Sequence, residues 1–378
     1  MKRTGFGGWL LLAAALSAAC GDRAAPPGDT ARTPASTATT ATTVDGGADT
    51  LSLAERRAVG GRIVFVSERG GAPRAFVVAP TGEGAREIAA GGGASYPAAV
   101  SPDGRTLLAI AVREQGGDHG EQMMLAPMEG GGRVRSLGPA GPRARSAAWS
   151  PDGKWVVFES DRASFRDLYR IAPDGTGLRR LTENREGNFD PAVSPDGRWI
   201  AFASSRDGDA EIYLMRADGG VQRRLTAFHR DDWGPRWSPD GRTLAFLSNR
   251  EGADRVFLVS PDGTGLRKLS AGADSAGAPW QEADPAWSPD GTRIAFTRHV
   301  RPGESRVRIV DVRTGGAREV GGGTAAASQP AWSPDGRYLA FTAGSGEDAE
   351  LWIARADGSR ATRITRSNGA DWLPRWVR

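Results

Sequence analysis

The chain has 378 residues, of which 39% are hydrophobic, so it can bury a core and is not disordered throughout. Its 52 Gly and 24 Pro disfavour long helices and favour many short strands joined by turns. One Cys excludes a disulfide framework and cysteine-rich metal clusters. The formal net charge is +4, and its 49 Lys and Arg are scattered among 45 Asp and Glu, so the basic footprint of a nucleic-acid-binding protein is missing.

The N-terminus has the pattern of a secretory signal peptide. Lys2 and Arg3 precede an uncharged apolar run over residues 9–19, far shorter than the roughly 20 residues needed to span a bilayer. Cys20 follows small residues at the place where such a peptide is cleaved. This arrangement resembles the lipobox of bacterial lipoproteins, in which the Cys is lipidated and becomes the mature N-terminus, although Ser17 stands where that family favours Leu. The resemblance implies a protein of the bacterial cell envelope, on the periplasmic side, held to the inner or outer membrane by its lipid alone. An ordinary signal peptide cleaved nearby is the alternative.

The segment after the Cys predicts an unfolded spacer. It is rich in Ala, Thr, Pro, Gly and Asp and nearly lacks large apolar side chains, so it cannot offset the entropy lost on ordering. A flexible chain of this length has a root-mean-square reach on the order of 35 Å. We therefore expect a signal peptide over residues 1–19, the lipidated Cys20 with a disordered tether over 20–60, and a folded domain over 61–378.

One motif is repeated through the expected folded domain. Ser-Pro-Asp-Gly occurs six times, and its Ser residues stand at 101, 150, 194, 238, 288 and 333. A period in the forties with four strand-like pieces per unit predicts a β-propeller. Residues 232–269 show the unit: strand, tight turn, strand, loop, strand, a second Asp-Gly turn and strand. In the first turn Pro presets φ, Asp bonds the backbone ahead of it and Gly accepts positive φ, so we expect these Asp to form turns rather than a site.

The two ends of the chain supply a seventh unit. Residues 62–88 match strands two to four of a unit, and residues 371–376 match a first strand with nothing after it. Side by side they complete one blade and remove an exposed sheet edge. We therefore predict an all-β fold, a seven-bladed β-propeller closed by pairing of the C-terminal strand with the N-terminal blade, with six blades as the alternative count. The Trp residues that end first strands, such as Trp237, are expected to fill the space between blades.

The repeat resembles the WD40-like repeats of the TolB family. A Trp before Ser-Pro-Asp-Gly, Ser-x-Arg after the second strand (residues 204–206 and 248–250) and residues 211–219 carry the resemblance, which covers the whole expected folded part. It implies a propeller fold but no single function, because similar propellers serve as envelope scaffolds, as lid domains of prolyl peptidases and as sugar-acid lyases. TolB itself is a periplasmic partner of peptidoglycan-associated lipoprotein, but it has an α/β domain before its propeller and six blades. Its role is therefore not implied for this chain.

Propeller topology sorts the connections onto two faces. The Ser-Pro-Asp-Gly turns and the second Asp-Gly turns lie on one face, which we call the turn face, where the units are nearly alike. The two-to-three hairpins and the inter-blade loops lie on the other, which we call the loop face, where the units differ. Aromatic, acidic and Arg residues gather there around the expected central channel and suit an envelope protein or peptide partner. These candidate binding residues are Tyr96, Phe189, Asp190, Asp232, Trp233, Trp280, Asp284, Asp371, Trp372, Arg162, Arg206 and Arg250.

Two structural roles compete with binding at these positions. An Asp before Pro commonly starts a turn, and an Arg that recurs at one position can pair with an acidic residue in the neighbouring strand.

The sequence favours a binding protein over an enzyme. Its three His, at 119, 229 and 299, fall at different repeat positions, whereas the lyases of this resemblance bring several His to one metal. There is no G-x-S-x-G elbow and no G-K-[ST] phosphate loop. We expect no catalytic residue, cofactor or metal, with Ca²⁺ at the channel Asp residues left open. The alternatives are a propeller that binds a glycan or small ligand, and a propeller lyase or hydrolase with a channel site.

Overall fold

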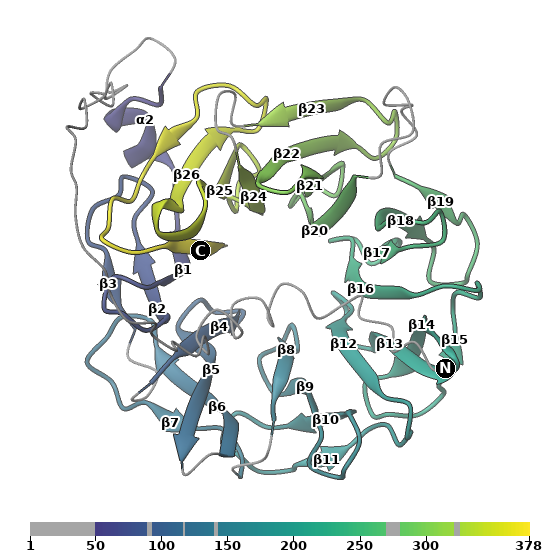
Figure 1. The fold of residues 1–378 in the computed structure, drawn as a ribbon. Coiled ribbons are helices and arrows are strands. Elements are labelled where there is room, and N and C mark those ends of the chain that lie inside the picture. Colours follow the sequence, from purple (N-terminus) through teal and green to yellow (C-terminus); the bar gives the residue numbers. More distant parts are fainter. Residues whose placement is uncertain (1–49, 89–92, 116–117, 140–142, 270–279, 321–325) are drawn as a thin grey trace, which may run out of the picture. The chain divides into compact units, whose positions relative to one another are not determined.

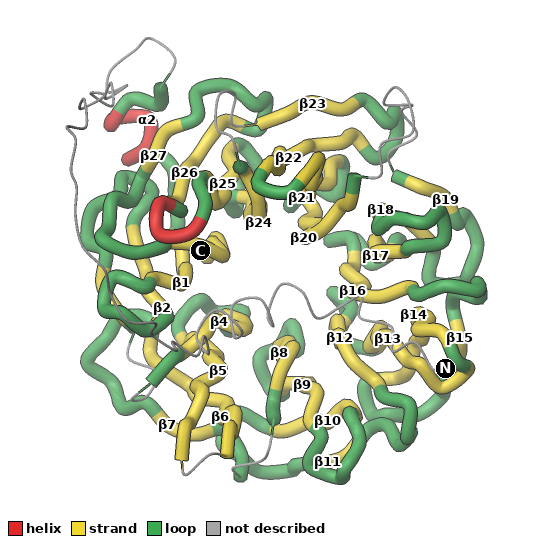
Figure 2. Tube along the Cα trace, viewed as in Figure 1, coloured by secondary structure: helices red, strands yellow, loops and turns green. Residues whose placement is uncertain are grey.

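The computed structural model describes residues 50–88, 93–115, 118–139, 143–269, 280–320 and 326–378. Residues 51–378 form one compact unit of seven four-stranded antiparallel sheets arranged around a common axis (Figure 1). The rest of the described chain is loop, apart from the short helix α2 (Leu53–Ala58) and the 3-10 turn η1 (Gly346–Asp348) (Figure 2). Within the described ranges, no helix is long and apolar enough to cross a membrane. The predicted seven-bladed propeller is confirmed.

Each sheet is one blade, and its strands follow one another from the axis outward. Blade I holds β28 (Asp371–Val377), β1 (Arg62–Ser67), β2 (Arg74–Val78) and β3 (Arg86–Glu87). Blade II holds β4 (Ser95–Val100), β5 (Thr106–Gln115), β6 (Asp118–Pro127) and β7 (Arg135–Ser136). Blade III holds β8 (Arg145–Trp149), β9 (Val156–Ser160), β10 (Asp167–Ile171) and β11 (Arg179–Arg180). Blade IV holds β12 (Asn188–Val193), β13 (Trp199–Asp207), β14 (Asp209–Arg216) and β15 (Arg223–Arg224).

The remaining three blades repeat the order. Blade V holds β16 (Asp232–Trp237), β17 (Leu244–Ser248), β18 (Arg255–Val259) and β19 (Arg267–Lys268). Blade VI holds β20 (Gln281–Trp287), β21 (Arg293–Arg301), β22 (Glu304–Asp311) and β23 (Ala317–Val320). Blade VII holds β24 (Ala327–Trp332), β25 (Tyr338–Ala343), β26 (Glu350–Arg355) and β27 (Thr362–Arg363).

The second strand of each blade reads as a nearly continuous apolar run because both faces of the sheet are covered. In β17, all five residues of Leu244–Ser248 are buried, and Phe246 is fully buried. Phe202 and Phe296 occupy the same position in β13 and β21 and are also fully buried. The core therefore lies between neighbouring sheets and holds the blades face to face.

The first and last strands of the described chain close the ring. β28 pairs with β1 in antiparallel register, and Ile63 lies opposite Trp376. The predicted closure is confirmed: the C-terminal strand completes the N-terminal blade, so the inner edge of β1 is covered.

The Ser-Pro-Asp-Gly turns have the predicted chemistry. In blade V, Ser238 Oγ and the Arg242 N–H both donate to Asp240 Oδ1, at 2.6 and 3.1 Å. These bonds hold the pKa of the Asp240 carboxyl below its usual value, the Ser238 hydroxyl contributing most. Gly241 has φ +70°, and a Cβ there would lie 3.6 Å from the Cδ of Pro195 in the preceding turn. Consecutive turns therefore touch one another, and their Asp side chains are used in the turns.

Three of the Trp residues that end first strands join neighbouring blades, as predicted. The Trp237 indole N–H donates to the Ala192 carbonyl of blade IV at 3.0 Å. Trp287 and Trp332 make the same bond to the preceding blade, at 3.1 and 3.0 Å. Each indole thus packs apolar surface between two sheets and satisfies a backbone carbonyl on the inner edge of its neighbour.

The ordered structure begins before the expected domain boundary at residue 61. The end of the segment predicted to be a disordered tether instead forms α2, capped by the Ser52 hydroxyl, with buried Leu51 and Val59 in the core between blades VII and I. The burial of these two apolar side chains holds α2 against the propeller. The predicted signal peptide, Cys20 and the predicted tether up to residue 49 lie outside the described residues.

Candidate functional site

Four arginines of the loop face repeat one arrangement inside their blades. In blade V, the Arg250 guanidinium lies over Phe246 and Phe257, with its Cζ 5.7 and 4.5 Å from the ring centroids. Its Nε donates to Ser248 Oγ at 2.8 Å. Blades I, III and IV repeat the stacking with Arg69, Arg162 and Arg206. The recurrent Ser-x-Arg therefore closes the aromatic core at the loop face, with the hydroxyl fixing the guanidinium.

Three of these arginines reach the first residue of the innermost strand. Arg250 Nη2 lies 2.8 Å from Asp232 Oδ2, and Arg69 Nη2 lies 2.9 Å from Asp371 Oδ2. Arg206 Nη2 donates to Asn188 Oδ1 at 2.9 Å. The side chains of both Asp residues are fully buried. These pairs therefore lie within the blades, where the buried carboxylates have charged partners.

Each innermost strand is interrupted by a β-bulge near its middle. In six blades the bulge residue has a positive φ, between 45° and 62°. These residues are Ser146, Asp190, Gly234, Asp284, Gln329 and Leu373. Asp190 and Asp284 thus precede Pro not in turns but in bulges, at +52° and +53°, where a bulge changes the direction of a side chain.

Side chains of the preceding blade bind the bulge N–H groups. The Asp190 N–H donates to Glu159 Oε2 at 3.2 Å, and the Leu373 N–H donates to Gln329 Oε1 at 2.9 Å. The Gln329 N–H donates to Thr297 Oγ1 at 2.8 Å, and that hydroxyl donates to Asp284 Oδ2 at 3.0 Å. These polar contacts connect blade III with IV, VI with VII and VII with I, and they hold the strained bulges in place.

Charged side chains from separate blades meet at the axis. Arg236 and Arg375 are exposed to solvent and stand on the innermost strands of blades V and I. Desolvation by the surrounding protein, the largest cause, and the charge of Arg236 together lower the pKa of Arg375 to about 10, while the charge of Asp284 opposes the shift. Two blades separate blade V from blade I, so the strands β16 and β28 that carry the two arginines approach the common axis from different sides (Figure 1).

Three carboxyl groups, of Glu159 in blade III, Asp190 in blade IV and Asp284 in blade VI, are protonated more readily than free carboxyls. Burial raises the pKa of Glu159 to about 7, and the charge of Asp190 adds to the effect. Burial also raises the pKa of Asp190 and of Asp284, which Arg236 partly offsets in both. The centre of the propeller is therefore polar and carries charges of both signs.

Aromatic side chains surround this charged centre on the loop face. Trp372 of blade I lies 6.1 Å from Tyr96 of blade II, centroid to centroid. Trp280 has Arg298 over one ring, with its Cζ at 4.0 Å, and Phe189 has Arg166 at 5.0 Å. Trp372, Trp280 and Phe189 are half-buried, so part of each ring faces solvent.

The structure thus divides the predicted residues into two groups. Inside the blades lie Tyr96, Trp233, Asp232 and Asp371, all buried, together with the stacked Arg162, Arg206 and Arg250. At the surface lie Phe189, Asp190, Trp280, Asp284 and Trp372. Sequence reasoning missed Glu159, Arg236 and Arg375. The two arginines stand directly after Pro in β16 and β28, whereas Ala follows Pro in β12, β20 and β24. An Arg in place of Ala at this repeat position is the sequence signal that could have identified them.

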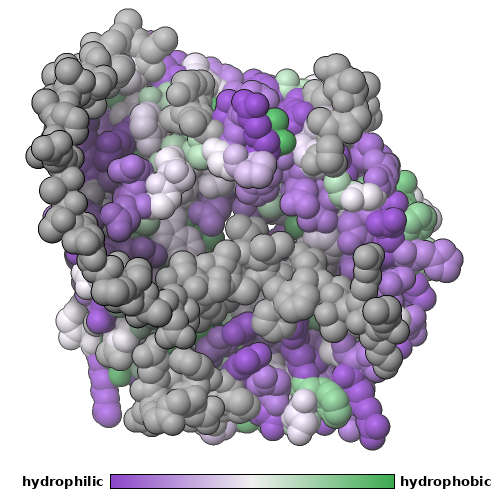
Figure 3. All heavy atoms as spheres, in the orientation of Figure 1, coloured by the Kyte–Doolittle hydropathy of each residue, from purple (hydrophilic) through white to green (hydrophobic). Residues whose placement is uncertain are grey.

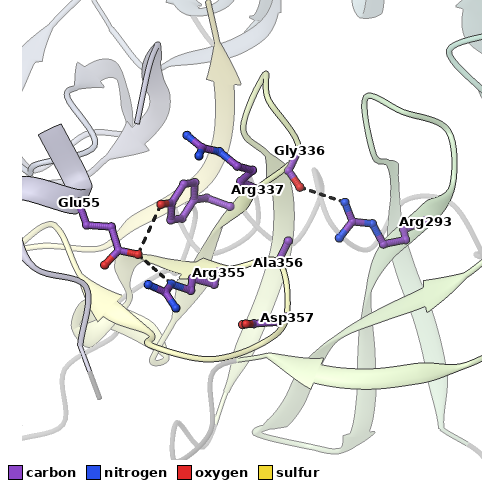
Figure 4. Close-up of a pocket in the computed structure, with 8 residues that line it drawn as sticks. Glu55, Arg293, Gly336, Arg337, Arg355, Ala356 and Asp357 are labelled. Carbon is purple, nitrogen blue, oxygen red and sulfur yellow. Dashed lines mark hydrogen bonds and ion pairs between the residues drawn. The ribbon is translucent and has the colours of Figure 1, made fainter. Parts of the chain in front are cut away.

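A recess of about 420 Å³ lies on the turn face, where α2 meets blade VII. Glu55 of α2 accepts a hydrogen bond from Arg355 Nε at 2.8 Å and from the Tyr338 hydroxyl at 3.4 Å (Figure 4). Arg293 of blade VI donates to the Gly336 carbonyl at 3.0 Å (Figure 4). These contacts hold the helix and the neighbouring turn in place.

No described group of three or more His, Cys, Asp or Glu is arranged to hold a metal ion. Two of the His lie apart, His229 in an exposed loop and His299 in β21, and the His119 side chain is outside the described residues. On the face seen in Figure 3 the described residues are mostly hydrophilic, and hydrophobic ones form small separate patches.

Two family models match the chain. Residues 281–378 match the TolB beta propeller domain, and residues 163–278 match the Tricorn protease N-terminal beta propeller domain. An uncharacterized Agrobacterium fabrum protein, Atu1656, is 34% identical over 104 residues, which are 26% of this chain. The match spans 31% of the length of that relative, about a third.

Solved structures share the fold. TolB from Acinetobacter baumannii has a TM-score of 0.53 at 21% identity, over 84% of this chain and 66% of its own. A puromycin hydrolase has a TM-score of 0.63 at 19% identity, over 82% of this chain and 53% of its own. At these identities the similarity shows that the chain shares the propeller fold and does not show its function.

Proposed function

The repeats of this chain belong to the TolB-like β-propeller repeat family, and from that premise we propose that the protein is a non-enzymatic component of the bacterial cell envelope. It binds a protein or peptide partner through the loop face. A lipid on Cys20 holds it at the membrane, on the periplasmic side, and the segment before residue 50 acts as the tether.

The observation that carries the proposal is the set of half-exposed aromatic rings on the loop face. Trp372, Trp280 and Phe189 come from three blades, and each is held against Tyr96 or an Arg that limits its motion. Rigid aromatic side chains with a polar neighbour are the usual anchors of protein interfaces, because they bury large areas at a small entropic cost.

The charged centre complements these anchors. Arg236 and Arg375 offer guanidinium groups to acidic or carbonyl groups of a partner, and Asp190 and Asp284 offer acceptors. Charges of both signs at the axis fix the orientation of an inserted segment more than they add affinity.

The test is crosslinking and pull-down from detergent-solubilised membranes of the native host. Trp280→Ala with Trp372→Ala is compared with wild type and with Leu178→Ala plus Leu266→Ala, which removes exposed apolar side chains of the turn face. We expect the loop-face variant to lose the partner and the turn-face variant to retain it. Equal recovery from all three proteins would refute the proposed surface.

Two rival functions predict different results for the purified protein. A glycan or small-ligand binding propeller predicts that a ligand raises the melting temperature with its occupancy. A propeller lyase or hydrolase predicts turnover of a glycan or peptide that is lost on changing Asp190 or Asp284. The proposed function predicts neither result.

A further inference from the structure

The turn face carries exposed apolar side chains in three consecutive blades. Leu178 of blade III, Val221 of blade IV and Leu266 of blade V are 37%, 55% and 45% exposed. Each stands just after a second Asp-Gly turn. Val221 stands one position earlier in its repeat than Leu178 and Leu266 do, so the three share the end of the same turn, and exposed large apolar residues there add nothing to burial within a blade.

The three tips form one continuous arc. Gln222 Nε2 of blade IV donates to the Leu181 carbonyl of blade III at 3.1 Å. Arg223 of blade IV donates to the Pro261 carbonyl of blade V. These bonds hold the three turns against one another at the outer edge of the turn face, so the tips are presented together. We call residues 178–179, 221–223 and 266–267 the outer arc.

Val221 stands in a conformation that its side chain disfavours. Its φ is +49°, and the corresponding residues in blades III and V are Gly177 and Gly265, at +65° and +68°. A β-branched residue in the left-handed region is strained, and no burial of Val221 compensates for the strain. An exposed Val at a glycine position therefore points to a role for its apolar side chain at the surface.

Cations accompany the apolar tips. Arg179 and Arg267 directly follow Leu178 and Leu266, and both are exposed. Nearer the axis, five of the six Ser-Pro-Asp-Gly turns are followed by an exposed cation. These cations are Arg105, Lys154, Arg198, Arg242 and Arg337. The Asp side chains of these turns are also ionised: Lys154 Nζ lies 3.8 Å from Asp152 Oδ2 and Arg337 Nε lies 2.8 Å from Asp335 Oδ2, whereas Arg179 and Arg267 stand farther out beside the apolar tips. Apolar tips flanked by basic residues are the composition of surfaces that lie in a membrane interface.

The chain enters the propeller at this same face. The Leu51 N–H donates to Thr362 Oγ1 at the start of β27, at 2.7 Å, and α2 is held by Glu55 to Arg355 of the second turn of blade VII. Leu53 of α2 is 40% exposed there. If Cys20 is lipidated, as the proposed function has it, the point at which the anchored segment joins the propeller lies on the turn face.

We propose that the outer arc docks on the headgroup region of an anionic phospholipid membrane. Leu178, Val221 and Leu266 enter the interface, while Arg179 and the cations around the axis contact lipid phosphates. The loop face then points away from the membrane, toward the partner. The approach of the turn face to the membrane depends on the proposed lipid anchor, whereas the exposed residues of the outer arc do not.

The experiment separates the arc from the anchor. Full-length protein with Cys20→Ser, which cannot be lipidated, is sedimented with vesicles of phosphatidylcholine containing phosphatidylglycerol and with vesicles of phosphatidylcholine alone. We expect binding to the anionic vesicles that falls as salt is added, since charge attraction supplies part of it. Leu178→Ser, Val221→Ser and Leu266→Ser together should weaken this binding by about tenfold or more.

Two further variants complete the test. Phe165→Ser with Val300→Ser removes exposed apolar side chains from loop-face hairpins and should leave binding unchanged. Arg179→Glu should weaken binding to the anionic vesicles only. No binding by the Cys20→Ser protein, or equal binding by the triple variant, overturns the inference. The pull-down of the partner is unaffected by these outcomes, so the two proposals fail separately.

Discussion

Arg69 Nη2 lies 2.9 Å from Asp371 Oδ2 and so joins the first hairpin of the propeller to the strand that closes it. The Asp371 side chain is fully buried, and the Arg69 guanidinium also lies over Phe76, with its Cζ 4.6 Å from the ring centroid. The same pair in blade V, Arg250 with Asp232, joins strands that are adjacent in the chain. The same Arg–Asp pair is therefore present in blade I, where the ring closes, and in blade V, whose four strands are continuous in the chain.

Asp371→Ala should lower the free energy of unfolding by about 3 kcal/mol, because it leaves a partly buried guanidinium without its carboxylate. The matched control is Asp232→Ala, which breaks the same pair within a continuous blade. Urea unfolding of both variants measures the difference, and Asp371→Ala is expected to cost more because it also loosens the closure. A loss under about 1 kcal/mol would mean that the pair adds little to closure.

Glu159 makes the stability of the propeller depend on pH. Burial raises the pKa of Glu159 to about 7, with the charge of Asp190 adding to the effect, against an ordinary value of 4.5. Between those two values the folded protein binds more protons than the unfolded chain, so this group destabilises the fold increasingly as pH rises through the window.

Glu159→Gln keeps a side-chain oxygen as acceptor for the Asp190 N–H and cannot ionise. We expect the variant to be more stable than wild type by roughly 2 kcal/mol at about pH 8, and the difference to disappear toward about pH 4, below the ordinary pKa of the carboxyl. Urea unfolding across this range measures it. A difference that stays constant with pH would show that Glu159 does not titrate there.

Val221→Gly should raise the free energy of unfolding by about 0.5–1 kcal/mol. The left-handed φ of +49° costs a β-branched residue more than the extra chain entropy of glycine costs on folding. The control is Leu266→Gly, whose apolar side chain is similarly exposed but whose backbone has no positive φ, and which should lose stability instead. Thermal unfolding of both variants decides between them, and a loss of stability in Val221→Gly would contradict the strain.

The local pattern of the repeat determined the fold. Ser-Pro-Asp-Gly requires Gly at positive φ and uses Asp in the turn, so six copies mark six blades, and the fragments at 62–88 and 371–376 complete a seventh. Trp237 before such a turn was predictable as inter-blade filling for the same reason. These features depend on residues within one unit or on the unit beside it.

The candidate site was only partly accessible to such reasoning. Asp232 and Asp190 both stand near the start of an innermost strand, yet Asp232 is buried against Arg250 whereas Asp190 reaches the axis. The difference comes from the bulge, which turns the backbone at Asp190 to φ +52°. A repeat pattern gives the register of a residue but not the direction of its side chain after a bulge.

The sequence by itself determined the number of blades, the turns and the way the ends meet, because each of these follows from hydrogen bonds and packing repeated in every unit. Only the tertiary structure decided that Arg236 and Arg375, 139 positions apart in the numbering of the chain, act on each other. It also decided that Leu51 and Val59 join the core and that Leu178, Val221 and Leu266 form one arc. The reason is physical: closing the ring brings together residues of separate blades, and that proximity depends on the curvature of the whole propeller.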